Sequence, residues 1–236
     1  MTGMNNAPYQ LLITGANRGL GLEFVKQYLA DGWRVIACCR NPLGASALIN
    51  LAATSGGRLS VRELDVADFG QVGQLAETLK GQAIDLLINN AGFYPEGAFG
   101  TVDYADWEQA FRINTMAPMK MAECFVAHVA ASRLRKIATL SSKMGSIADN
   151  GSGGSYLYRS SKTAVNMVMK SLAIDLQARG IAALTLHPGW VLTDMGGPNA
   201  LIGAEQSVSG MRQVIAQLTM ENAGRFVAYD GKEIPW

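Results

Sequence analysis

Short apolar runs alternate with helical patterns along almost the whole chain, and this order limits the possible folds more than any other feature. The apolar runs, which suit buried strands, are residues 11–13, 34–39, 84–88, 136–140, 182–186 and 226–228, and residues 59–63 alternate between apolar and polar like a further strand. Helical patterns cover residues 20–29, 43–54, 69–80, 104–133, 156–178 and 204–218. Such alternation favours parallel strands joined by right-handed crossovers. The sequence therefore predicts an α/β fold, a doubly wound parallel sheet of seven strands with helices on both faces.

Composition limits the classes of function. The 236 residues suit one large domain or two small ones, and no linker or change of composition divides them, so we expect one domain over residues 1–236. A net charge of +1 gives no general attraction to nucleic acid or to a membrane surface. No run approaches the ~18 apolar residues of a membrane span, and residues 1–8 have no leader pattern. The three cysteines show no disulfide framework or metal spacing. We expect a cytoplasmic protein without a metal site.

A glycine-rich turn joins the first strand to the first helix. Its sequence is TGANRGLG, with glycines at positions 15, 19 and 21. One glycine would allow a tight turn, one a close backbone approach to a ligand, and one close packing of helix on strand. The helix N-terminus would then offer free N–H groups to a phosphate. The G-x-x-x-G-x-G spacing differs from the common dinucleotide pattern G-x-G-x-x-G, and an ordinary structural turn also explains it.

Polar or glycine-rich clusters follow six of the predicted strands. These clusters are residues 15–21, Arg40, Asp65, residues 89–92, Ser141 with Ser142, and residues 188–193. Asp68 is the expected N-cap of the helix over 69–80. Because the carboxyl ends of parallel strands lie at one edge of a sheet, we expect a ligand site at this edge.

Tyr158 and Lys162 form the most specific pattern, because residues four apart share one face of a helix. A nearby ammonium favours the phenolate, so we expect Lys162 to lower the Tyr158 pKa from its usual value near ~10. A tyrosine packed under a lysine stem explains an isolated pair equally well. Ser142 could donate a hydrogen bond to an oxygen that gains charge, or cap a turn. Asn114 lies inside a helical stretch and could bend it and hold a water, or be exposed.

Taken together, these motifs resemble the single-domain branch of the short-chain dehydrogenase/reductase family. The matching residues are 14–21, the N-N-A-G sequence of residues 89–92, Asn114, Ser142, Tyr158 with Lys162, and Pro188-Gly189 with Thr193. Within the family, the sequences around Ser142 and Tyr158 and the closing residues 231–236 more closely resemble sniffer-type carbonyl reductases and C-factor-like bacterial proteins. The resemblance implies a Rossmann fold. The loop between Ser142 and Tyr158 is longer than is usual in the family because of residues 149–155.

The resemblance implies that Tyr158 is the general acid in hydride transfer between a nicotinamide and a carbonyl carbon. Lys162 would hold the nicotinamide ribose, Ser142 would polarise the carbonyl, and Asn114 would support a water. Of the two adjacent serines, Ser142 fits the family's S-x-x-G pattern, because Gly145 follows it. The implied cofactor contacts are Gly15, Asn17, Arg18, Gly19, Leu20, Arg40, Asp65, Val66, Asn89, Ala91, Gly92, Tyr158, Lys162, Pro188, Gly189, Val191 and Thr193. Among these, Asp65 and Val66 would hold the adenine, while Asn89, Ala91 and Gly92 would line its ribose.

Charge at the second strand indicates which cofactor is bound. An NAD site places a carboxylate after this strand, whereas an arginine there can meet a 2′-phosphate. Here Arg40 follows the strand and Arg18 lies in the glycine turn, so we predict NADP(H). Two solvated surface arginines are the alternative.

The expected substrate is a small or flat aldehyde, ketone or quinone. An apolar pocket is predicted from Phe93, Tyr94, Met144, Ile147, Trp190 and Met195, with the irregular residues 190–203 as a lid. Each of these side chains could also be ordinary core. A Ser142 hydrolase using His128 or His187 is disfavoured because no G-x-S-x-G motif occurs. An NADP(H)-binding sensor is the second functional class. The helix over 156–178 is apolar around most of its circumference, which predicts a homodimer or homotetramer.

Overall fold

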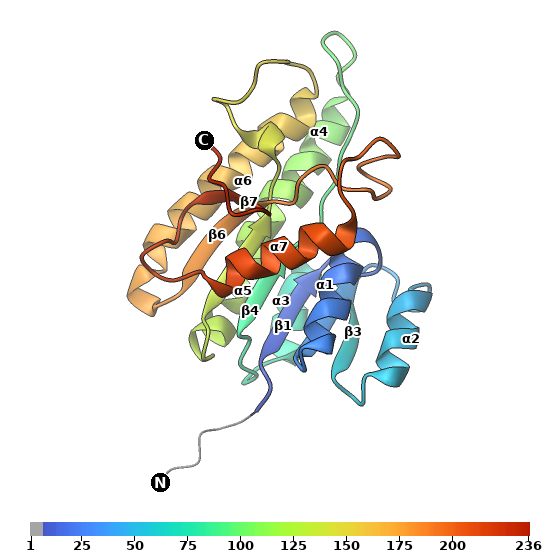
Figure 1. Ribbon diagram of the computed structural model, residues 1–236, viewed down its shortest axis with the longest axis vertical. Helices are drawn as coiled ribbons and strands as arrows, with labels where there is room; N and C mark the ends of the chain where they lie inside the picture. The colour runs from blue at the N-terminus through green and yellow to red at the C-terminus, as the bar shows by residue number, and fades with distance from the viewer. Residues whose placement is uncertain (1–6) are drawn as a thin grey trace.

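The central sheet has seven parallel strands in the order β3-β2-β1-β4-β5-β6-β7, as the computed structural model of residues 7–236 shows (Figure 1). The strands are β1 (Gln10–Thr14), β2 (Arg34–Cys39), β3 (Leu59–Glu63), β4 (Leu86–Asn89), β5 (Lys136–Leu140), β6 (Ala182–His187) and β7 (Phe226–Ala228). The winding direction reverses between β1 and β4, which pair with each other although two strands and three helices separate them in sequence. The predicted doubly wound sheet is confirmed.

Helices cover both faces of the sheet (Figure 1). The helices are α1 (Gly19–Ala30), α2 (Ser46–Thr54), α3 (Phe69–Thr78), α4 (Tyr104–Phe111), α5 (Ala117–Ala130), α6 (Tyr156–Asp175) and α7 (Ala204–Ala216). Phe24 of α1 and Met211 of α7 are buried in the core on one face. Phe125 of α5 and Val165 of α6 are buried in the core on the other. The central strands are therefore covered on both faces, as their continuous apolar sequences require, whereas Arg62 and Glu63 of the edge strand β3 are exposed.

Several helix boundaries differ from the sequence prediction. The helices expected over 69–80 and 204–218 end at Thr78 and Ala216. The helix expected over 43–54 begins only at Ser46, because the Asn41 side chain accepts a hydrogen bond from Gly44 N and forms a turn instead. The helical region expected over 104–133 is divided by a π-helical turn, Arg112–Met116. The helix expected over 156–178 ends at Asp175, and a short 3₁₀ turn, Gln177–Arg179, follows it.

Other local predictions are confirmed. Asp68 caps α3 by accepting hydrogen bonds from Gly70 N and Gln71 N. Residues 188–203 contain no helix and only one isolated bridge, between Val191 and Ile202. Within residues 7–236, no helix combines the length and apolar character needed to cross a membrane.

Candidate active site

The glycine turn after β1 is as tight as its sequence predicts. Gly15 and Gly19 have positive φ angles of 63° and 53°, a conformation that favours glycine. A Cβ on Gly21 would lie 2.7 Å from Asn90 Nδ2 and would also clash with the Gly15 carbonyl. Gly21 is therefore the position that lets α1 lie directly against the ends of β1 and β4.

Asn90 and Thr14 fix this turn, and the sequence analysis assigned neither of them a role. Asn90 Nδ2 donates hydrogen bonds of 2.9 Å to the carbonyls of Thr14 and Gly15. The Thr14 hydroxyl accepts hydrogen bonds from Asn90 N and Ala91 N, each at 3.1 Å. The signal was present in the sequence, because an asparagine between Asn89 and Ala91 has an amide able to satisfy carbonyls that a glycine turn leaves free.

The start of α1 has the features of an anion site. Arg18 occupies the N-cap position, and its side chain makes no capping hydrogen bond, so no side chain takes the first N–H groups of the helix. A Cβ on Gly19 would lie 3.5 Å from Thr193 Cγ2, which places this turn against the segment after β6. These residues fit the pyrophosphate of a dinucleotide, which would take the helix N-terminus and the space left by the missing side chains.

Two exposed arginines lie at this edge. Arg18 forms an ion pair of 2.6 Å with Asp194, and the two side chains are 70% and 74% exposed. Arg40 is exposed directly after β2, as is Asn17 in the glycine turn. Both guanidinium groups are therefore accessible to a phosphate.

The residues expected around the adenosine differ in their burial and in their hydrogen bonds. Asp65 Oδ1 accepts a hydrogen bond of 2.9 Å from Ala67 N, and Val66 is buried. Asn89 is 4% exposed, and its Nδ2 donates to Thr139 Oγ1 at 3.1 Å inside the sheet. Its Oδ1 has no hydrogen-bond partner within residues 7–236. The Asn89 side chain therefore braces β4 against β5, whereas Ala91 and Gly92 are partly or fully accessible.

Tyr158 and Lys162 are both buried on α6 beneath the end of β5. Lys162 Nζ lies 5.6 Å from the centre of the Tyr158 ring and donates a hydrogen bond of 2.9 Å to the Leu140 carbonyl. It also lies 3.8 Å from the position that a Cβ on Gly92 would occupy. Burial lowers the pKa of Lys162 to about 8. The pair is thus enclosed between the ends of β4 and β5, as the order of the motifs predicts.

The Tyr158 pKa moves in the direction opposite to the sequence prediction. Burial raises the pKa of Tyr158 to about 12, a hydrogen bond with Ser142 opposes the rise, and the neighbouring Tyr94 adds to it. The expectation that the Tyr158 pKa lies below its usual value is therefore wrong. The physical reason is that enclosure disfavours the phenolate more than the available partners stabilise it. At neutral pH Tyr158 is a protonated phenol.

The structure distinguishes the two adjacent serines. Ser142 is partly exposed, is hydrogen-bonded with Tyr158, and accepts a hydrogen bond of 3.2 Å from Met144 N. Ser141 is buried, and its hydroxyl is directed to the Lys162 carbonyl at 3.4 Å. Ser142 is therefore the serine that lies against the phenol, and it also caps the following turn.

Asn114 lies within the π-helical turn and is 1% exposed. Its Oδ1 accepts from Phe93 N and its Nδ2 donates to Phe93 O, both at 2.8 Å. The Nδ2 also lies 3.0 Å from Ser161 Oγ. The interrupted helix thus turns a buried amide toward the loop after β4, and simple exposure of Asn114 is excluded.

A family model described as short chain dehydrogenase matches residues 10–201. The chain belongs to the short-chain dehydrogenase family. A curated relative, C-signal of Myxococcus xanthus, is 46% identical over 154 residues, which are 65% of this chain and 93% of that protein. The carbonyl reductase Sniffer of D. melanogaster has a TM-score of 0.91 and 34% identity, covering 98% of this chain and all of that one. An NADPH-bound carbonyl reductase from chicken fatty liver has a TM-score of 0.91 and 32% identity, covering 97% and 99%.

These similarities make the chain a carbonyl-reductase-like oxidoreductase of the short-chain dehydrogenase family.

The two histidines of this short-chain dehydrogenase take no part in a serine-hydrolase arrangement. His187 Nδ1 accepts a hydrogen bond from Lys143 N at 3.2 Å, and burial lowers its pKa to about 4. His128 lies on α5 against Phe125. Among residues 7–236, no group of His, Cys, Asp and Glu side chains is placed to hold a metal ion.

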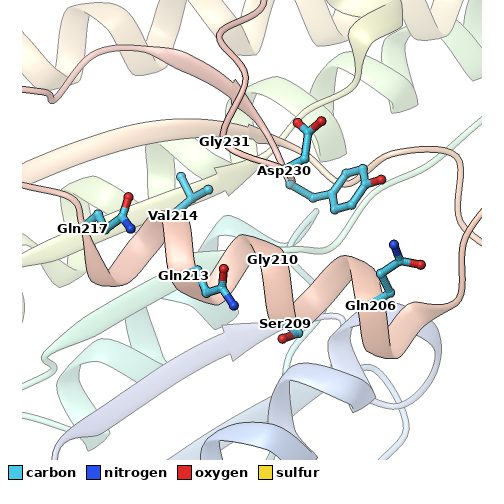
Figure 2. A pocket seen from close by; sticks show the side chains of 9 residues that line it. Gln206, Ser209, Gly210, Gln213, Val214, Gln217, Asp230 and Gly231 are labelled. Carbon is cyan, nitrogen blue, oxygen red and sulfur yellow. The ribbon is translucent and has the colours of Figure 1, made fainter.

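The molecule also has a cavity of about 350 Å³ (Figure 2). It is formed by α7 and the turn after β7, and Figure 2 shows Gln206, Gln213 and Asp230 around it. None of the predicted short-chain dehydrogenase site residues lines it.

Proposed function

We propose that the chain reduces an aldehyde, ketone or quinone to an alcohol with NADPH, and that Tyr158 donates the proton. The observation that carries this proposal is the placement of the Tyr158 phenol, which is buried, hydrogen-bonded with Ser142, and has Lys162 Nζ 5.6 Å from its ring centre. A phenol in this state is ready to give up its proton to an oxygen that becomes an alkoxide.

The side chains around the phenol have separable tasks. NADPH supplies a hydride to the carbonyl carbon when it is bound. As the C=O electron pair moves to oxygen, the Ser142 hydroxyl stabilises the growing charge and Tyr158 transfers its proton to that oxygen. The Lys162 ammonium, 5.6 Å from the ring centre, stabilises the phenolate left behind until solvent returns a proton. Asn114 fixes the backbone at Phe93 beside them.

The cofactor assigned by this proposal is NADP(H). Its support is the exposed pair Arg18 and Arg40 at the edge that follows β1 and β2, and the NADPH-bound carbonyl reductase similar to this chain. Each charged hydrogen bond to a 2′-phosphate contributes about 1.5–3 kcal/mol. Fluorescence titration should therefore show NADPH binding at least ~10-fold more tightly than NADH, and equal affinities would contradict the assignment.

An apolar carbonyl substrate fits the surface at the strand ends. Large apolar side chains are exposed in the segments after β4, β5 and β6, namely Tyr94, Phe99, Ile147, Trp190, Leu192, Met195 and Leu201. Exposed apolar groups gathered on loops of one edge are typical of a binding surface. A panel in which only charged, sugar-like carbonyls turned over would exclude this substrate class.

The decisive experiment measures NADPH oxidation with a panel of carbonyl compounds for the wild type and Tyr158→Phe. Loss of the proton donor should lower kcat at least ~100-fold, with NADPH affinity retained. Retained turnover in Tyr158→Phe would exclude Tyr158 as the donor. A signalling role, which the name of the Myxococcus relative supports, predicts instead that cells carrying Tyr158→Phe keep their phenotype despite lost turnover.

We also propose that residues 1–236 form one catalytic domain that assembles as a homodimer or homotetramer in the cytoplasm. Residues 1–6 of this range lie outside the described residues. Met167 and Ile174 of α6 are 67% and 59% exposed, while Val165 on the same helix is buried. A single-chain mass near 25.2 kDa in light scattering would exclude the assembly. Free Cys38, Cys39 and Cys124 support a reducing compartment.

A further inference from the structure

A second tyrosine lies directly against the proposed proton donor. The rings of Tyr94 and Tyr158 are 4.5 Å apart between centres and tilted by 56°. Tyr94 is 39% exposed, whereas Tyr158 is 8% exposed. Tyr94 therefore covers part of the buried phenol and presents its remaining surface at the strand edge where a carbonyl substrate must enter. Tilted aromatic pairs at this distance attract each other, so each ring restrains the other.

Both ends of Tyr94 are held. On its backbone side, the preceding residue Phe93 is fixed through its N–H and its carbonyl by the Asn114 amide, each at 2.8 Å. On its side-chain side, the hydroxyl lies 3.2 Å from Ser155 Oγ. These bonds at both ends hold the Tyr94 ring in one place. A loop side chain without such bonds would be free to change its orientation.

The partner Ser155 is itself held by a well-bonded loop. It is one of two non-glycine residues with a positive φ among residues 7–236, at 46°. Arg159, one turn into α6, donates to Gly153 O at 3.1 Å, to Ser152 Oγ at 2.8 Å and to Met144 O at 3.3 Å. These bonds tie the long loop between Ser142 and Tyr158 to the helix that carries the proton donor. The strained backbone at Ser155 persists because its surroundings hold it.

We infer that Tyr94 is a positioning and specificity-determining residue: it fixes the Tyr158 ring and, with Ser155, forms a wall that limits the width of the carbonyl substrate. This inference rests on the proposed reduction at Tyr158 and narrows its substrates to flat or slender carbonyl compounds. A wide substrate meets the Tyr94 ring before its carbonyl oxygen reaches the phenol. The additional residues 149–155 of the loop after Ser142 include Ser155, which holds the Tyr94 hydroxyl in this wall.

The test compares two aldehydes with the same reacting group and different widths, 4-nitrobenzaldehyde and 3,5-di-tert-butylbenzaldehyde. Tyr94→Ala should raise the ratio of kcat/KM for the wide aldehyde to that for the flat one at least ~10-fold. It should also lower kcat for the flat aldehyde, because the Tyr158 ring loses its neighbour, while NADPH affinity stays within ~2-fold. Tyr94→Phe keeps the ring, so its ratio should stay within ~3-fold of wild type.

The hydroxyl contact is tested by Ser155→Ala and by the double variant Tyr94→Phe/Ser155→Ala. Each of these variants lacks the hydrogen bond between the Tyr94 hydroxyl and Ser155 Oγ, which Tyr94→Phe also lacks. The double variant should therefore change the ratio of kcat/KM values no more than either single variant does. Tyr104→Ala is the matched control, because Tyr104 is 72% exposed on α4 and contacts Trp107 instead of the site. An unchanged ratio in Tyr94→Ala, or an equal change in Tyr104→Ala, overturns the inference.

The two proposals fail in different ways. If wild type oxidises NADPH with neither aldehyde nor any other carbonyl, the proposed function fails, and a crystal structure of Tyr94→Ala decides the positioning role alone. In that structure the Tyr158 ring should leave its wild-type orientation or occupy more than one. A Tyr158 ring unmoved from its wild-type position would overturn the positioning role.

Discussion

The turn after β1 and the segment after β6 lie at the same edge of the sheet but are built differently. The turn is held from within the molecule, because Asn90 bonds two of its carbonyls and Ala16 N donates to Cys38 O of β2 at 3.0 Å. Residues 190–203 mainly bond to one another, as in the 2.9 Å bond from Leu192 N to Ile202 O. Trp190 and Met195 in this segment are 50% and 54% exposed.

This difference matches what the proposed function requires of each region. A dinucleotide presents the same phosphates in every turnover, so a rigid turn that leaves no room for side chains suits it. A carbonyl substrate must enter and leave, and a segment with few bonds to the rest of the fold opens at little cost in free energy. The contrast predicts that substitutions in the turn destabilise the fold and that substitutions in the segment change binding alone.

Gly21→Ala should have the largest effect. Its Cβ would lie 2.7 Å from Asn90 Nδ2 and 2.9 Å from Ala16 Cα, in a place without room to relax. We expect the free energy of unfolding to fall by about 3 kcal/mol, measured by urea denaturation, and NADPH binding to be lost.

The matched control is Gly73→Ala. Gly73 lies on α3, where an added Cβ meets no atom within 4 Å, so this variant should gain about 0.5–1 kcal/mol. Equal stabilities of the two variants would show that the turn is less rigid than its contacts indicate.

Lys162 is buried between the ends of β4 and β5, and its burial has a stability effect that depends on pH. Burial lowers its pKa to about 8 from 10.5, so below pH 8 the folded protein carries a buried ammonium at a constant cost. Between pH 8 and 10.5 the unfolded chain binds more protons at this group, and the contribution of Lys162 to stability therefore rises with pH. A shift of this size corresponds to about 3 kcal/mol.

The comparison with Lys162→Met isolates this effect from other groups that titrate in the same range. The variant should be more stable than wild type at pH 7, and the difference should shrink toward pH 10.5. A difference that is constant across this pH range would mean that Lys162 is charged in the folded protein throughout.

Asn90→Ala should have an intermediate effect. It removes two hydrogen bonds of 2.9 Å to the carbonyls of the turn, which together stabilise the fold by about 2 kcal/mol. Asn222→Ala is the control, because Asn222 also makes two side-chain bonds to backbone, at Thr219 N and Gln217 O, but in an exposed place. Thermal denaturation should show a larger loss of stability for Asn90→Ala than for Asn222→Ala. Similar losses would mean that the two hydrogen bonds of Asn90 stabilise the fold no more than those of an exposed asparagine.

The sequence predicts the sheet and the identity of the site because both depend on local patterns. Apolar runs fix the strands, and the order of the motifs places Tyr158, Lys162 and Ser142 at one edge. Asn114 is a partial success, since a mid-helix asparagine indicates a disturbed helix but not the π turn that the structure has.

Other features depend on contacts between distant residues and could not be predicted. The sign of the Tyr158 pKa shift depends on how completely the loops enclose the ring, which a four-residue spacing does not encode. The contact of Tyr94 with Ser155 joins residues 61 positions apart. Asn89 shows the same limit, because its side chain reaches Thr139 on a strand that only the folded sheet brings beside it.

The ion pair between Arg18 and Asp194 joins the turn after β1 to the segment after β6, and breaking it should have the smallest effect on stability. Both side chains are mostly exposed, so Asp194→Asn should change the free energy of unfolding by less than about 1 kcal/mol. NADPH affinity should nevertheless rise about 2- to 5-fold, because Arg18 is released and a carboxylate no longer repels the phosphate. This gain should shrink in 0.5 M NaCl, where the Debye length is only about 4 Å. Glu77→Gln is the control, because it removes the same charge from an equally exposed ion pair, which Glu77 of α3 forms with Lys80 just after that helix. If both variants bind NADPH alike, the ion pair has no influence on the cofactor site, and the segment after β6 acts independently of the turn.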